Sequence, residues 1–271
     1  MGWLRDTLID RAARLLTRRR RRYQLLQTNN LANLRAAVRK GDVVLVDGDQ
    51  RVSEMIKYLT QSSWSHAVLY VGDELLRRFP ERRRGLVDQW GIEAEHMVVE
   101  ALMEGGVLAS PLVKYLEFNV RICRPRGLRM EDLVRVFDEV LAQLGSSYDL
   151  DNFLELARYF FPVTLIPRRL RRAALEQGGD LMTNVICSSM IGRAFQNVGF
   201  PILPGMEPAR DEVQGWADWL RRRKTHYPAL FHRQRETLIT PRDFDLSPYF
   251  DVVKFNAVEE GAFDYRRIRW A

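Results

Sequence analysis

The chain has 271 residues, enough to bury one sizeable hydrophobic core, and its 46% apolar and 28% charged residues are typical of a globular protein. Two cysteines do not make a disulfide framework, so a reducing compartment fits the composition. The longest apolar stretch, residues 159–166, contains Pro162 and falls far short of the roughly 20 residues that span a bilayer.

The beginning of the chain lacks the pattern of a secretory signal. Charged residues stand among the first sixteen, where a signal peptide has an uninterrupted apolar region. We therefore expect residence in the cytoplasm, which includes the inner face of the membrane if the chain binds lipid. A secretion route without a signal peptide stays open.

Residues 1–40 are predicted to form a basic amphipathic helical segment. They carry eleven of the 42 basic residues but only two of the 35 acidic ones, so the net charge of +7 comes from this segment. Apolar residues recur at helical spacing from Trp3 to Leu16, five consecutive arginines follow at 18–22, and a second apolar pattern ends at Val38.

Two interpretations of this segment remain open. The helix packs its apolar side on the domain, or it binds an anionic membrane surface through apolar insertion and charge attraction. Nucleic acid is not expected as a partner, because aromatic residues are not interleaved with the arginines as a stacking surface requires.

The remaining residues, 41–271, are predicted to form one domain of the α+β class, in which short strands and helices follow one another along the chain. The pair Gly41-Asp42 separates this domain from the N-terminal segment. Strands are expected over 43–46, 66–71, 97–101, 120–123 and 250–255, and helices over 51–60, 131–144 and 187–198.

Two of these elements begin with residues that could take part in catalysis. His66 begins a predicted strand and Cys187 begins a predicted helix. A thiol needs a base to act as a nucleophile near neutral pH, and a helix N-terminus lowers its pKa further. Taken singly, each residue has a plainer interpretation: a small core cysteine, and a histidine that only satisfies a hydrogen bond.

A metal site is the other chemistry that these residues suggest. It would combine His66, His96 and Cys187 with a carboxylate, but no pair has the close ligand spacing that is typical of zinc sites. We therefore expect neither a metal ion nor another cofactor.

Several short motifs, taken in order, resemble one family. They lie at residues 41–46, 63–72, 99–101, 105–107, 147–149, 187–190, 239–243 and 247–248. This order is similar to that of the circularly permuted papain-like cysteine hydrolases of the YiiX/YaeF type. Those enzymes are related to the NlpC cell-wall peptidases and, more distantly, to the lecithin:retinol acyltransferase group. The resemblance implies an antiparallel sheet packed against the helix that carries the nucleophile.

The resemblance also implies roles for individual residues. Cys187 would be the nucleophile, His66 the general base, and Glu100 the group that orients and stabilises the imidazolium. The assignment of Glu100 competes with other polar residues nearby in the sequence: Glu93, His96 and Glu104.

Three further residues are expected to contact the substrate: Tyr148, Ser65 and Ser188. The chain departs from the family pattern in its basic N-terminus and in inserts at 77–95 and 151–183. The second insert comes just before the nucleophile, where access of the substrate is decided.

The function that follows from this resemblance is thiol-dependent hydrolysis of amide or ester bonds through an acyl-enzyme. Peptidoglycan-type peptides and acyl lipids are the implied substrates, and the basic N-terminus favours a substrate at a membrane surface. The alternatives are an acyltransferase of the same fold and a membrane-associated binding protein without turnover.

Overall fold

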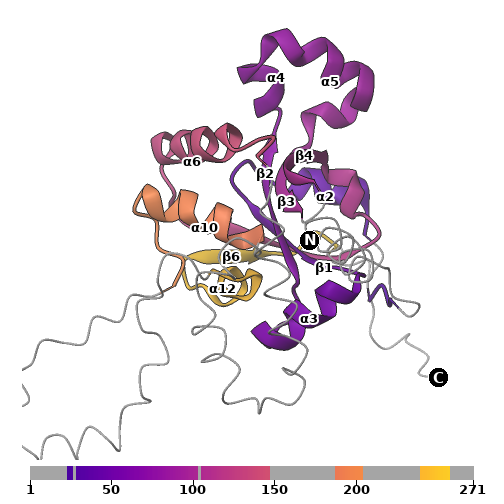
Figure 1. The fold of residues 1–271 in the computed structure, drawn as a ribbon, viewed down its shortest axis with the longest axis vertical. Helices are drawn as coiled ribbons and strands as arrows, with labels where there is room; N and C mark the ends of the chain where they lie inside the picture. Colours follow the sequence, from indigo (N-terminus) through magenta and orange to yellow (C-terminus); the bar gives the residue numbers. More distant parts are fainter. Residues whose placement is uncertain (1–22, 27–28, 103–104, 147–186, 204–238, 257–271) are drawn as a thin grey trace, which may run out of the picture.

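The core of the protein is a six-stranded antiparallel sheet (Figure 1). The computed structural model describes residues 23–26, 29–102, 105–146, 187–203 and 239–256. The strands lie in the order β4-β3-β2-β1-β5-β6. Their bounds are β1 Val43–Asp47, β2 His66–Gly72, β3 Met97–Leu102, β4 Gly106–Pro111, β5 Asn119–Pro125 and β6 Phe250–Val253.

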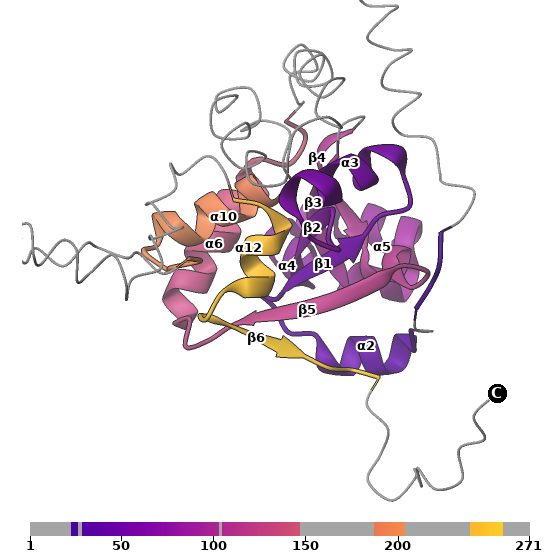
Figure 2. The same ribbon diagram turned by 90° about the horizontal axis from the view of Figure 1, so that it is seen from below.

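Helices cover both faces of this sheet, which gives the α+β class that the sequence predicted. The α-helices are α2 Leu31–Ala37, α3 Arg51–Thr60, α4 Glu74–Arg78, α5 Arg83–Trp90, α6 Met130–Ala142, α10 Cys187–Asn197 and α12 Pro241–Leu246. Short 3-10 turns are η1 Pro80–Arg82, η2 Gly91–Glu95 and η3 Leu112–Tyr115. Figure 2 shows α6, α10 and α12 together on one side of the sheet and α2 on the other.

Alternation along the strands divides the apolar residues between two cores. On one face, Ala67 and Leu69 of β2 pack with α6 and with Ile191 and Phe195 of α10. On the other face, Val68 and neighbouring strand residues pack with α2 and with η3. The sheet is thus packed against the helix that begins at Cys187, as the sequence predicted.

The strand register brings several segments to one end of the sheet. Val46 pairs with His66 across β1 and β2, and Asp47 pairs with Asn119 across β1 and β5. β3 runs antiparallel to β2, so its last residues also reach the end at which His66 lies. The start of β2 and the ends of β1 and β3 therefore meet there, and we call this edge the His66 end of the sheet.

The later part of the N-terminal segment belongs to the core. Leu34 of α2 is fully buried and Val38 nearly so, and both pack on the face that contains Val68. Residues 31–38 thus pack on the domain, whereas residues 1–22 lie outside the described residues. Gly41 makes the turn into β1 with a φ of +90°, a conformation that side chains with a Cβ rarely adopt.

Several parts of the fold were not predicted as regular structure, among them α12 and η3. β4 pairs with β3 along its whole length, and the arginine-rich stretch at 77–95 forms short helices that extend from the end of β2 (Figure 1). None of the helices within the described ranges has the length and apolar character needed to cross a membrane.

Gly192 of α10 lies in close contact with Ile239, in the segment that precedes α12. A Cβ added to Gly192 would lie 2.3 Å from Ile239 Cδ1 and 3.0 Å from Ile239 Cβ. Gly192→Ala is therefore expected to lower the free energy of unfolding by about 1–3 kcal/mol, the usual range for overpacking. Urea titration measures the change.

Gly85→Ala is the matched control, because this α5 glycine has nothing within 4 Å of the added Cβ. Alanine at that position is expected to be neutral or slightly stabilising, since glycine disfavours a helix interior. Equal effects of the two substitutions would mean that the contact with Ile239 does not constrain α10.

Candidate active site

His66 and Glu100, the predicted base and its predicted orienting group, contact each other on one face of the sheet. Nε2 of His66 lies 3.1 Å from Oε2 of Glu100, and the two residues come from the neighbouring strands β2 and β3. The Glu100 side chain is fully buried, whereas that of His66 is 16% exposed. Both lie on the face that contains Val68 and Val98, because side chains two apart in a strand share a face.

Glu100 is held as a carboxylate by the groups around it. Burial by itself would raise its pKa, but the hydrogen bond and charge of His66, followed by those of Lys114, outweigh burial and hold the pKa well below its usual range. An ionised carboxylate only accepts hydrogen bonds, so Nε2 of His66 carries the proton. The ring nitrogen with basic character is therefore Nδ1.

Two residues that the sequence analysis missed also bind Glu100. Lys114 donates from Nζ to Oε1 at 2.5 Å, and the Tyr115 hydroxyl donates to Oε2. Both belong to η3, which follows the unpredicted strand β4. A lysine next to a tyrosine in a short turn carries no distinctive signal, and only the register of β4 against β3 brings this turn to Glu100.

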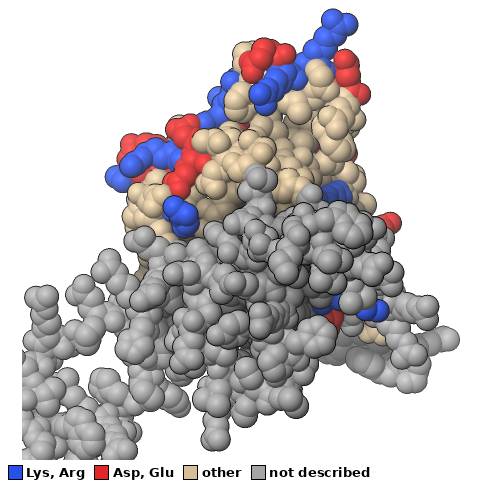
Figure 3. All heavy atoms as spheres, viewed as in Figure 1, with Lys and Arg blue, Asp and Glu red and all other residues tan. Residues whose placement is uncertain are grey.

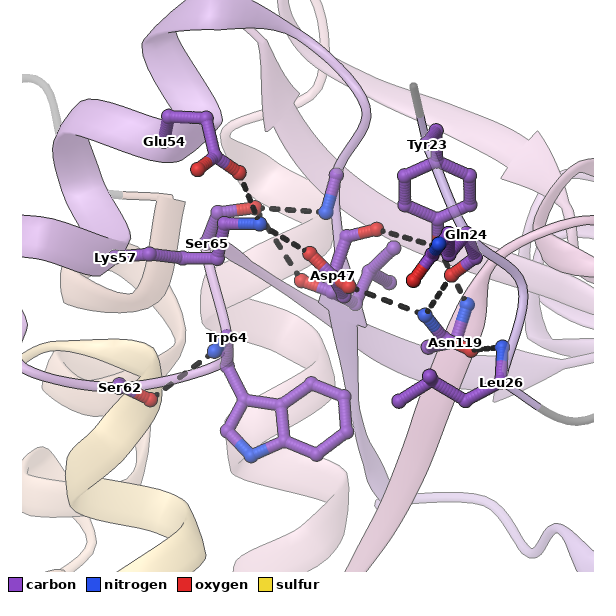
Figure 4. Close-up of polar contacts among 12 residues, drawn as sticks. Tyr23, Gln24, Leu26, Asp47, Glu54, Lys57, Ser62, Trp64, Ser65 and Asn119 are labelled. Carbon is purple, nitrogen blue, oxygen red and sulfur yellow. Dashed lines mark hydrogen bonds and ion pairs between the residues drawn. The ribbon is translucent and has the colours of Figure 1, made fainter. Parts of the chain in front are cut away.

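Ser65 lies next to His66, but its hydroxyl contacts the main chain. It accepts a hydrogen bond from Gly48 N at 2.9 Å and donates to Val46 O at 3.4 Å, so it joins the start of β2 to the end of β1 (Figure 4). Trp64, the preceding residue, donates from Nε1 to Asp245 of α12 at 3.1 Å. These bonds fix the main chain from which His66 projects; substrate contact by Ser65 stays a prediction.

The predicted helix that begins at Cys187 is confirmed as α10, Cys187–Asn197. This helix contacts β2 and β3, the strands that carry His66 and Glu100. The side chain of Cys187 lies outside the described atoms, so the pairing of its thiol with His66 stays a prediction. The buried Ser188 donates to Ile239 O at 2.5 Å and ties the first turn of α10 to the segment before α12.

The other predicted site residue, Tyr148, lies outside the described residues, as does the insert at 151–183. Cys123 is described and fully buried in β5, where burial raises its pKa to about 12.

The metal site that the sequence suggested includes His96. Nδ1 of His96 lies 2.9 Å from the Tyr70 hydroxyl oxygen. Within the described ranges, no three His, Cys, Asp or Glu side chains gather as a metal ion would require.

The described geometry is thus a strand-borne histidine bonded to a buried glutamate on one face of the sheet, with the helix that begins at a cysteine packed on the other face. The domain around this pair is of the α+β class. Residues 37–161 match the family model described as a permuted papain-like amidase enzyme, YaeF/YiiX, C92 family. The match confirms the predicted resemblance, supports a hydrolase of amide bonds, and includes His66 and Glu100 but ends before Cys187.

One solved structure to which the chain is similar is described as the metalloprotein YiiX from Escherichia coli O157:H7. The two sequences are 15% identical, the match covers 81% of this chain and 98% of the YiiX chain, and the TM-score is 0.45. Among curated proteins, none matches the chain.

Proposed function

We propose that the protein is a cysteine amidase in which Cys187, His66 and Glu100 act as one unit. The observation that carries this proposal is the contact of His66 with the buried Glu100, on the two strands that α10 contacts. Because His66 is the first residue of β2, the Cys187 thiol is expected to approach its Nδ1 around the end of the sheet.

The reaction would take place in two halves. In the first, Nδ1 of His66 takes the thiol proton, the thiolate adds to the amide carbonyl, and main-chain amides at the start of α10 stabilise the oxyanion. The C–N bond then breaks as the imidazolium gives its proton to the leaving amine, which leaves a thioester on Cys187. In the second, His66 takes a proton from water, the hydroxide attacks the thioester, and the acid and the free thiol are released.

Selective alkylation tests this proposal without a known substrate. Iodoacetamide at pH 6 is expected to modify Cys187 and to spare Cys123, because only a thiolate reacts and burial raises the pKa of Cys123 to about 12. His66→Ala should slow the modification by at least about tenfold, since the imidazolium stabilises the thiolate. Peptide mass spectrometry gives the site and rate of labelling.

His96→Ala provides the matched control, because this histidine bonds Tyr70 and does not contact Glu100. It is expected to leave the labelling rate unchanged. Equal labelling of the two cysteines, or equal rates for the two histidine variants, would exclude a thiol paired with His66.

We further propose that the substrate, a peptidoglycan-type peptide or an acyl lipid, is met at an anionic membrane surface that residues 1–22 bind. The contacts of the residues that follow this segment support the proposal, because they attach the segment near His66. The Tyr23 hydroxyl donates to Asp47 O at 3.0 Å and accepts from Asn119 N at 2.8 Å (Figure 4). Asn119 also bonds the main chain of Gln24 and Leu26. Residues 1–22 therefore join the domain at the His66 end of the sheet.

The arginine-rich stretch at 77–95 is a weaker candidate for such a surface. Its five arginines are accompanied by four acidic residues, and Figure 3 shows the two charges interspersed over the projection formed by α4 and α5. Mixed charge does not attract anionic lipid over a Debye length as a run of arginines does. The basic excess at residues 1–22 is thus the better membrane-binding element.

A panel of muropeptides and fatty-acyl lipids, followed by mass spectrometry, would identify the bond that is broken. Release of a free acid supports hydrolysis, whereas transfer to a second substrate would show an acyltransferase. Stoichiometric labelling of Cys187 with no turnover on any member of the panel would favour a binding protein.

A further inference from the structure

Three side chains donate hydrogen bonds to the carboxylate of Glu100. A carboxylate needs only one of these bonds, that from His66, to hold the imidazole ring. His66 and the Tyr115 hydroxyl meet at Oε2, and Lys114 lies 2.5 Å from Oε1. These are the titratable groups that face Glu100 from β2 and η3. A buried carboxylate stays ionised only when hydrogen bonds and opposite charge replace the lost water.

The turn that carries these two donors is itself fixed. Leu112 N donates to His96 O at 2.8 Å, and Phe118 N donates to Tyr115 O at 3.1 Å. The Tyr115 side chain is buried, and its ring centroid lies 6.0 Å from that of Phe118 and 6.3 Å from that of His66. Tyr115 therefore contacts both members of the pair: Glu100 through its hydroxyl and His66 through its ring.

We propose that Tyr115 and Lys114 are positioning residues that set the place and the ionised state of Glu100, and through it the proton on Nε2 of His66. The two act differently. Tyr115 shares Oε2 with His66 and fixes where that oxygen lies, whereas Lys114 supplies a positive charge at the other oxygen. This proposal rests on the proposed role of His66 as the base.

The proposal predicts a change in the pH profile of Cys187 alkylation. Lys114 lowers the pKa of Glu100 through its charge and its hydrogen bond, so loss of Lys114 lets that pKa rise. Loss of the Tyr115 hydroxyl removes a donor to the charged carboxylate, which acts in the same direction. On acidification Glu100 then takes up a proton at higher pH, and the imidazolium loses its counter-charge. The acid limb reports formation of the thiolate–imidazolium pair of Cys187 and His66. It should therefore move upward in Tyr115→Phe and in Lys114→Met, by at most about one pH unit, because a hydrogen bond to a charged group is typically worth that much.

Matched variants separate this effect from a general loss of stability. Tyr70→Phe removes the hydroxyl of another buried tyrosine on the same face, which bonds His96. Lys40→Met removes a lysine that is 30% exposed, against 37% for Lys114, and that binds Glu74 at 2.6 Å. Both controls should keep the acid limb of the unaltered protein. Lys114→Arg should reverse most of the shift seen in Lys114→Met, because arginine returns the positive charge.

A second measurement follows the hydrogen bond itself. The proton on Nε2 of His66 should give a far-downfield NMR signal that moves in Tyr115→Phe and not in Tyr70→Phe. Acid limbs that coincide with those of the controls, together with an unmoved proton signal, would overturn the proposal. Failure of the proposed function would give a different result from failure of this inference. If His66 is not the base, the single variant His66→Ala would be alkylated at Cys187 as fast as the unaltered protein.

Discussion

Cys187→Ala is expected to reduce amide hydrolysis by at least about 10⁴-fold, which is the usual cost of removing the nucleophile from a unit of this kind. His66→Ala should cost a similar factor, and the double variant should be no worse than either single one, because the two residues act in the same step. Turnover of the substrate found with the muropeptide and lipid panel measures all three.

Glu100→Gln should leave a measurable remainder of this activity. An amide at this position keeps one oxygen acceptor, but its NH2 group faces a donor where the carboxylate had an acceptor. The loss is therefore expected to be smaller than for Cys187→Ala, although losses on the order of 10⁴-fold occur at such positions. The proposed reaction uses no metal ion. If a chelator abolishes activity and added zinc restores it, that proposal is contradicted.

The strands were predictable because their apolar runs are short and bounded by turn residues. Residues 43–46 and 97–101 are rich in valine and became β1 and β3. β4 was missed because Gly106–Pro111 contains glycine, serine and proline, and its strand conformation depends on pairing with β3. Such pairing is a long-range contact that local propensity does not contain.

The candidate site shows the same division between local and long-range information. The sequence indicated His66 and Glu100 through motifs, and the register of β2 against β3 brings them together. Lys114 and Tyr115 have no motif around them, so their contact with Glu100 became visible only in the folded chain. Residues that lie within short motifs are thus easier to find in a sequence than residues that only strand pairing brings into contact with them.

Removal of residues 1–22 is expected to abolish binding to anionic vesicles while the domain stays folded. The five arginines at 18–22 each contribute roughly 1 kcal/mol near an anionic surface, so replacing them with glutamine should weaken binding by at least about 100-fold. Sedimentation with phosphatidylcholine vesicles, with and without phosphatidylglycerol, measures binding. Alkylation of Cys187 should be unchanged in the truncated protein.

The boundary at residue 22 follows from the contacts of the residues after it. Tyr23 bonds Asp47 and Asn119, and Leu34 is fully buried, so removal of residues 1–40 would open the core and is expected to unfold the domain. Replacing Arg83 and Arg84 of α5 with glutamine is the matched control and should leave vesicle binding unchanged, because that surface has mixed charge. If full-length protein ignores anionic vesicles, or if loss of residues 1–22 unfolds the domain, residues 1–22 are a structural part of the domain and the substrate has to be sought away from the membrane.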